Sequence, residues 1–248
     1  MKIIFAIDDT DNAESPGTGH LAQDISERIE QERWGKCSGI TRHQLYIHRD
    51  IPYTSHNSAM CFEADILKDR LDKIIDFGIR FLEEKSAQGS DPGLCVAVAG
   101  RRLDKKRLTH FGLLAKRKVL TKELAYALAG NLKVHLTEHG GTGQGVVGAL
   151  AGVGLRLAGN DGRFRGWYHF GRAGEKISVQ TLCSYDFIDS VRSCNGEILE
   201  RDAMVLLGGD RLKTVLRDAE SVVLVTRTDS ELQDIQWKTL TKEQVKQY

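Results

Sequence analysis

The first twenty residues constrain this chain more than any other stretch. An apolar run, Ile3–Ile7, stops abruptly at Asp8-Asp9-Thr10-Asp11. Five apolar residues in succession are typical of a buried strand, so we expect a strand that delivers three carboxylates to its end. Carboxylates this close raise one another's pKa unless a cation lies among them. Oxygen-only ligands suit Mg²⁺, which usually takes one or two protein carboxylates and fills its other positions with water and phosphate.

The same acidic segment has a second interpretation that needs no metal. Asp, Asn and Thr close turns and cap helices, and two aspartates at a strand end are often only part of a solvated loop. Spacing alone leaves both interpretations open. An aspartate-nucleophile phosphatase is excluded, because its Asp-x-Asp-x-Thr pattern is broken by Ala13 when counted from Asp9 and by Thr10 when counted from Asp8.

The residues after the acidic segment favour the metal interpretation. Residues 12–20 are rich in turn formers, and residues 21–34 place Leu21, Ala22, Ile25 and Ile29 on one helical face. A helix opened by Gly17-Thr18-Gly19 offers free backbone N–H groups and a positive dipole end, which favour an anion. We therefore expect Thr10, Gly17, Thr18, Gly19 and His20 to surround a bound phosphate or its acceptor.

A second glycine-rich stretch, His139–Gly145, follows an expected strand and opens an expected helix over residues 146–158. Gly143-x-Gly145-x-x-Gly148 has the letters of a dinucleotide fingerprint, but the acidic residue that should end a second parallel strand is missing. No Walker lysine follows either. Either the backbone N–H groups of this loop approach a ligand, with Gly141, Thr142, Gly143 and Gly145 as candidates, or the glycines only let a helix pack tightly on a sheet.

Several motifs together resemble one family, the archaeal isoleucine-tRNA 2-agmatinylcytidine synthetases. The likeness covers roughly residues 1–172 and is carried by Ile7–Asp11 with Gly17-Thr18 and Leu21-Ala22, by residues 51–59, by Ser90–Gly93 and by Gly143–Leu150. It implies an unusual ATP-using kinase domain in which Thr18 accepts a phosphoryl group. The chain departs from the family at Thr54 and His56, where the family has Lys and Arg, and the substrate is correspondingly open.

The last part of the chain has a different character. Residues 175–248 contain short apolar runs separated by turn residues, which predicts a small β-rich module with a short terminal helix. The resembled synthetases carry an OB-fold and a zinc ribbon instead. We expect an α+β protein with a kinase-like domain over residues 1–90, a ferredoxin-like portion over 91–172 and a small β-rich module over 173–248.

Composition limits the other classes of function. The 248 residues carry a net charge of +1, so no global field recruits nucleic acid or membrane. The five cysteines include no C-x-x-C pair, which argues against a zinc ribbon. With no apolar stretch long enough to cross a bilayer and no signal peptide, we expect a cytoplasmic protein. Residues 101–122 are locally basic, which indicates either an RNA-binding face or only a solvated helix surface.

These observations predict ATP-dependent phosphoryl or nucleotidyl transfer with Mg²⁺ to an RNA or small-molecule acceptor. Asp8, Asp9 and Asp11 would hold the metal, and Asn57 with the loop 140–145 would close the pocket. Two alternatives remain open: a nucleotide-binding regulatory protein without turnover, and an RNA-binding module that uses residues 101–122.

Overall fold

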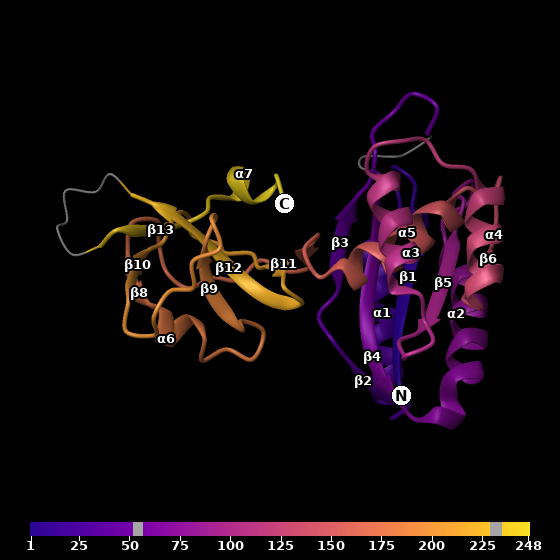
Figure 1. Ribbon diagram of the computed structural model, residues 1–248, viewed down its shortest axis with the longest axis horizontal. Helices are drawn as coiled ribbons and strands as arrows, with labels where there is room; N and C mark the ends of the chain where they lie inside the picture. The colour runs from indigo at the N-terminus through magenta and orange to yellow at the C-terminus, as the bar shows by residue number, and fades with distance from the viewer. Residues whose placement is uncertain (52–56, 229–234) are drawn as a thin grey trace. The chain divides into compact units, whose positions relative to one another are not determined.

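The computed structural model describes residues 1–51, 57–228 and 235–248. It divides the chain into two compact units, Met1–Ala158 and Gly159–Tyr248 (Figure 1). This single division falls after Ala158, whereas the sequence predicts boundaries at residues 90 and 172. The two predicted boundaries stay predictions. Residues on both sides of position 90 contribute strands to one sheet, because the strand that begins at Gly93 pairs with the first strand of the chain.

The first unit is built on an antiparallel sheet with β1 at its centre. The strand order is β6-β5-β1-β4-β3, and β2 also pairs with β4. The strands are β1 (Lys2–Asp8), β2 (Gly35–Cys37), β3 (Thr41–Gln44), β4 (Ser58–Ile66), β5 (Gly93–Val98) and β6 (His135–Glu138). The apolar run predicted to form a strand is therefore β1, and Asp8 is its last residue.

Side chains of β1 alternate between two apolar layers. Ile3, Phe5 and Ile7 face one layer, whereas Ile4 and Ala6 face the other, and all five are at most 1% exposed. This alternation is the two-residue period of a strand that is buried on both faces. Each face needs a cover of helices, and the chain supplies one on each side.

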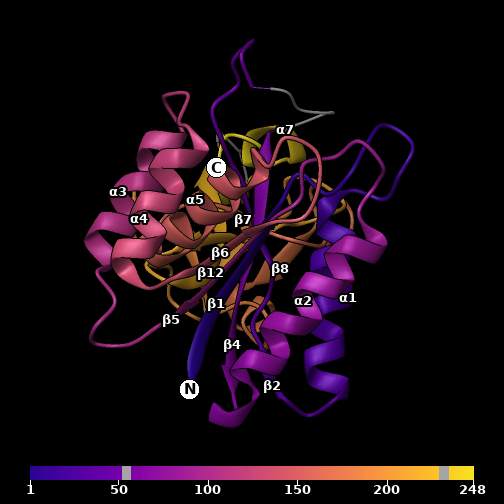
Figure 2. The ribbon, with the colours of Figure 1, turned by 90° about the vertical axis from the view of Figure 1, so that its right-hand side faces the viewer.

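Helices cover both faces of the sheet (Figure 2). One face packs against α1 and α2, and the other packs against α3, α4 and α5. Their bounds are α1 (Thr18–Gln31), α2 (Leu71–Lys85), α3 (Lys105–Ala115), α4 (Lys122–Leu132) and α5 (Gly145–Ala158), with a 3₁₀ turn, η1 (Lys68–Arg70), before α2. The helices expected over residues 21–34 and 146–158 are thus confirmed as α1 and α5, each beginning slightly earlier than predicted.

Two predicted strands are shorter than expected. The apolar pattern of residues 38–48 predicts one strand, but only β3 forms within this range, because the chain beyond β3 leaves the sheet and the Tyr46 N–H donates to the Ala115 carbonyl at 2.9 Å. The pattern of residues 163–170 likewise predicts a strand, but only β7 (Arg163–Phe164) forms within this range, because Gly166 takes a φ of +114° that a regular strand does not allow.

The second unit is rich in β-structure and ends in a short helix, as predicted. Its strand order is β7-β11-β12-β13-β10-β8, with β9 parallel to β12. Its remaining elements are β8 (Lys176–Ser178), α6 (Val179–Leu182), β9 (Ser190–Ser193), β10 (Met204–Leu206), β11 (Val215–Arg217), β12 (Glu220–Arg227), β13 (Trp237–Thr239) and α7 (Lys242–Val245). The whole chain is therefore a mixed α+β protein with mostly antiparallel sheet pairing. Among the described residues, no helix is long and apolar enough to cross a membrane.

Candidate functional site

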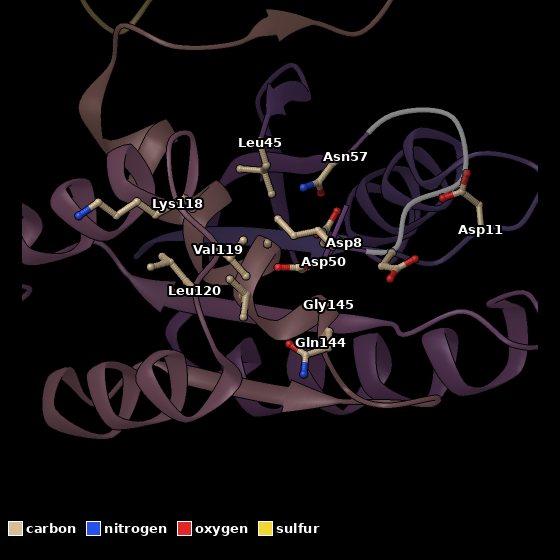
Figure 3. Close-up of a pocket in the computed structure, with 15 residues that line it drawn as sticks. Asp8, Asp11, Leu45, Asp50, Asn57, Lys118, Val119, Leu120, Gln144 and Gly145 are labelled. Atoms are coloured by element: carbon tan, nitrogen blue, oxygen red, sulfur yellow. The ribbon is translucent and has the colours of Figure 1, made fainter. Parts of the chain in front are cut away.

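A pocket lies at the carboxyl end of β1 (Figure 3). It encloses about 770 Å³ between its walls, including space open to solvent. Its polar lining combines acids from the β1 end with residues from the start of α5, while its apolar wall comes largely from the segment after α3. Its described lining residues are Asp8, Asp9, Asp11, Leu45, Asp50, Ile51, Asn57, Ala115, Lys118, Val119, Leu120, Gln144, Gly145, Val147 and Gly148.

Asp8 forms the buried floor of this pocket. Asp8 is 7% exposed, and a Cβ atom added to Gly148 of α5 would overlap the Asp8 Oδ2 atom. Burial raises the pKa of Asp8 well above its ordinary value, and the neighbouring carboxylates of Asp9 and Asp11 raise it further. The pocket therefore disfavours the ionised form of Asp8 relative to an exposed aspartate, and a cation in the pocket would act in the opposite direction.

Asp9 occupies a left-handed backbone conformation, with a φ of 52°, at the turn that follows β1. Burial raises its pKa to about 6, and repulsion by Asp91 and Asp11 acts in the same direction, while a backbone hydrogen bond from Asp91 opposes it. Repulsion among neighbouring carboxylates marks this turn as a place where a cation would be electrostatically stabilised.

Two of the residues predicted to surround a phosphate, Thr10 and Thr18, form hydrogen bonds that lead to Asp11. The Thr18 hydroxyl donates to Asp11 Oδ1 at 2.7 Å, and the Thr10 hydroxyl donates to the Thr18 Oγ1 atom at 3.1 Å. These buried threonines tie Asp11 to the start of α1, of which Gly17 is the N-cap residue. Gly19 and His20 lie in the first turn of that helix, and His20 is exposed. The phosphate-accepting role of Thr18 stays a prediction.

Asn57 and Gly145 line the pocket together with the acids, and their role in closing it over a ligand stays a prediction. The Asn57 side chain donates to the Tyr46 carbonyl at 2.7 Å, which fixes its orientation. Gly141, Thr142 and Gly143 belong to the neighbouring loop and are absent from the described part of the lining. Gly141 and Gly143 adopt φ angles of +56° and +78°, so the tight course of this loop requires glycine at both positions.

The donor atoms in the pocket are carboxylate and amide oxygens, which suit Mg²⁺. Within residues 1–51, 57–228 and 235–248, no three His, Cys, Asp or Glu side chains gather closely enough to hold a metal ion by themselves. Asp11 lies to one side of the pocket, away from Asp8 (Figure 3). The arrangement therefore fits an ion held by one or two carboxylates, with water and phosphate as its other ligands, and the three-aspartate ligand set stays a prediction.

Several residues of the site were not indicated by the sequence. Asp50, Lys118 and Gln144 line the pocket without having been expected there. Asp91 belongs to the Ser90–Gly93 motif of the family resemblance but was given no role in the site, yet it is 8% exposed and its charge repels that of Asp9. An acid directly before a Pro-Gly pair and a buried strand is the signal that could have found it. Thr54 and His56 lie outside the described residues.

Comparisons with known proteins identify the class of fold. Structures of TiaS, a tRNA agmatidine synthetase, match this chain. The complex of TiaS with tRNA and ATP has a TM-score of 0.54 at 21% identity, covering 88% of this chain and 51% of that one. The apo form has a TM-score of 0.52 at 23% identity, covering 80% and 48%. A tRNA fluorescent labeling enzyme gives 0.54 at 24% identity, covering 73% and 42%. This chain thus has a TiaS-like fold.

A particular relative is found by sequence. The uncharacterized protein MJ0921 of Methanocaldococcus jannaschii is 29% identical over 161 residues, which cover 62% of this chain and 50% of the relative. The chain therefore spans about half the length of the curated relative and of the solved structures that it matches. No family model matches the sequence.

Proposed function

We propose that this protein binds ATP with Mg²⁺ in the pocket at the end of β1 and transfers a phosphoryl or nucleotidyl group to an acceptor. The observation that carries the proposal is that two neighbouring acids, the buried Asp8 and the half-buried Asp9, line one pocket together with the first turn of α5 at Gly145. Acids can hold a divalent cation, and a helix start can hold phosphate. The TiaS-like fold supports a nucleotide as ligand, because one matched structure is a complex with ATP.

Different residues of the pocket would bind the metal ion, contact the phosphates and exclude water. Asp8 and Asp9 would hold Mg²⁺ in their ionised forms, with Asp11 nearby. The bound ion would neutralise phosphate charge and orient the transferring group. The backbone N–H groups at the start of α5 would meet phosphate oxygens, and Asn57 would close the opposite wall. Leu45, Val119 and Leu120 would exclude water from the base or sugar.

Titration calorimetry with ATP and Mg²⁺ tests the proposal. We expect Asp8→Asn and Asp9→Asn each to weaken the Mg²⁺-dependent ATP affinity by about tenfold or more, the equivalent of about 1.4 kcal/mol. Asp65→Asn is the matched control, because it makes the same change on the same sheet, at an exposed position on β4 opposite Lys2 at the other end of β1. We expect Asp65→Asn to bind like the unaltered protein.

The same experiment separates turnover from binding alone. If the unaltered protein binds ATP but releases neither ADP nor pyrophosphate with a panel of RNA and small-molecule acceptors, the regulatory alternative replaces the enzyme. If Asp8→Asn and Asp9→Asn both bind ATP as tightly as the unaltered protein and the Asp65→Asn control, the pocket at the end of β1 is not the nucleotide site.

A second candidate function rests on the basic segment. Lys106, Arg107 and His110 of α3 line a separate hollow whose remaining described lining is Phe111, Leu114 and Leu128. Cations around an open hollow can hold RNA phosphates, and two of the matched structures are complexes with tRNA. We propose RNA as the acceptor, held by this face. Reversing the charges of Lys105, Lys106 and Arg107 should then weaken RNA binding and flatten its salt dependence, while ATP affinity is unchanged.

A further inference from the structure

Asp91 joins the two loops that meet at the pocket. Its Oδ1 atom accepts a hydrogen bond from the Thr142 backbone N–H at 2.6 Å, and its Oδ2 atom accepts one from the Thr142 hydroxyl. Its backbone also forms a hydrogen bond with the Asp9 carboxylate. One residue just before β5 therefore contacts both the turn after β1 and the glycine-rich loop before α5.

The glycine-rich loop is shaped around Asp91. A Cβ atom on Gly141 would overlap Oδ1 of Asp91, and a Cβ atom on Gly145 would overlap the Asp91 carbonyl oxygen. The two glycines thus let the backbone pass on either side of this residue. Because Gly145 is also the first residue of α5, Asp91 contacts the chain at the point where that helix begins.

The chemistry of Asp91 is unfavourable for a residue whose only role is to hold the fold. It is buried, and its charge repels the Asp9 carboxylate. A neutral amide could accept the bond from the Thr142 N–H without that repulsion. A carboxylate, however, accepts two short charge-assisted hydrogen bonds from one threonine, and these hold the loop more firmly than neutral bonds.

We propose that Asp91 is a positioning residue for the nucleotide, which it serves by holding Thr142 so that the backbone N–H groups at Gln144 and Gly145 face the phosphates. The proposal rests on the proposed ATP site and deepens it, because it assigns the phosphate-facing geometry to one buried carboxylate. Asp91 acts through Thr142 and does not itself touch the nucleotide.

Two substitutions of Asp91 remove its hydrogen bonds to Thr142 stepwise. Asp91→Ala removes both acceptors, whereas Asp91→Asn keeps one acceptor and removes the charge. Calorimetry with Mg²⁺ and ATP should show affinity about tenfold or more lower for Asp91→Ala and intermediate for Asp91→Asn. Thermal unfolding should show Asp91→Asn at least as stable as the unaltered protein. A merely structural role predicts that stability and affinity fall together.

A double-mutant cycle tests whether Asp91 acts through Thr142. Thr142→Val keeps the backbone bond and should weaken ATP binding a few-fold, whereas Thr142→Ser should bind normally. Adding Thr142→Val to Asp91→Ala should weaken binding no further, because the partner is already lost. Asp104→Asn is the matched control, since Asp104 caps α3 through the Arg107 N–H at 3.1 Å and asparagine caps helices equally well.

Hydrogen exchange of the unliganded protein gives a readout that does not depend on ATP. The amides of residues 141–145 should exchange faster in Asp91→Ala, with Asp91→Asn between it and the unaltered protein. Equal exchange in all three, or normal ATP affinity in a folded Asp91→Ala variant, overturns the positioning role while leaving the ATP site intact. Failure of the unaltered protein to bind ATP rejects the proposed function and the role of Asp91 with it.

Discussion

The Asp9 carboxyl shows how a single residue links the electrostatics of the pocket to its stability. Burial and two neighbouring acids raise its pKa from 3.8 to about 6 in the folded protein. The folded state therefore binds this proton more tightly than the unfolded state does. The contribution of Asp9 to stability is present below about pH 3.8 and is lost as the pH rises through about 6.

We therefore expect the unliganded protein to lose stability between about pH 4 and pH 6 through this group, and Asp9→Asn to remove that part of the loss. Asparagine also tolerates the left-handed backbone that position 9 requires. Urea unfolding across this pH range measures the free energy of unfolding for both proteins. If the two curves run parallel, the Asp9 proton is bound equally in the folded and unfolded states.

At the scale of elements, the start of α5 matters most, because three glycines meet their neighbours there at contacts that exclude a Cβ atom. Gly145 lies against the Asp91 carbonyl, Gly148 against the Asp8 carboxyl, and Gly93 of β5 against the backbone at Gly145. The backbone of the first turn of α5 therefore lies in close contact with the end of β1 and the start of β5. Close packing by this glycine motif is confirmed, while its contact with a phosphate stays a prediction.

Gly148→Ala should destabilise the protein by about 1–3 kcal/mol, since its Cβ must displace the buried Asp8 carboxyl. Gly130→Ala is the control, because this exposed α4 glycine has nothing within 4 Å of the added Cβ. Alanine there should be neutral or raise stability by up to about 1 kcal/mol. Calorimetric scans measure both, and a neutral Gly148→Ala would contradict the contact with Asp8.

At the scale of the whole molecule, the chain separates into two units that each have their own core. The described lining of the pocket comes entirely from the first unit, Met1–Ala158. The second unit buries its own apolar residues, among them Val191, Val205 and Val223. The proposed nucleotide site therefore uses side chains of the first unit, as far as the described residues show.

A chain ending at Ala158 should fold and bind ATP with the affinity of the longer protein, within about threefold. Circular dichroism and titration calorimetry on this fragment are the measurements. Loss of ATP affinity in a folded fragment would show that the second unit completes the site. Loss of folding would show that the two cores are not independent.

Local order along the chain was predictable because it follows from short-range patterns. The alternation of β1, the apolar face of α1 and the acids at Asp8 and Asp9 all arise from residues adjacent in sequence, and the structure contains them where the patterns indicate. Strand ends near Ser38 and Gly166 were less predictable, because hydrogen-bond partners and a positive φ decide them.

Only the tertiary structure decided which distant residues share the pocket. Asp91 and Gly148 reach the acids of β1 from far along the chain, because antiparallel pairing of β5 with β1 places residue 93 beside Asp8 and close packing places α5 over both strands. No local period encodes that meeting. The sequence by itself determined a buried strand ending in acids, whereas long-range strand pairing and burial determined what those acids face and how tightly they hold their protons.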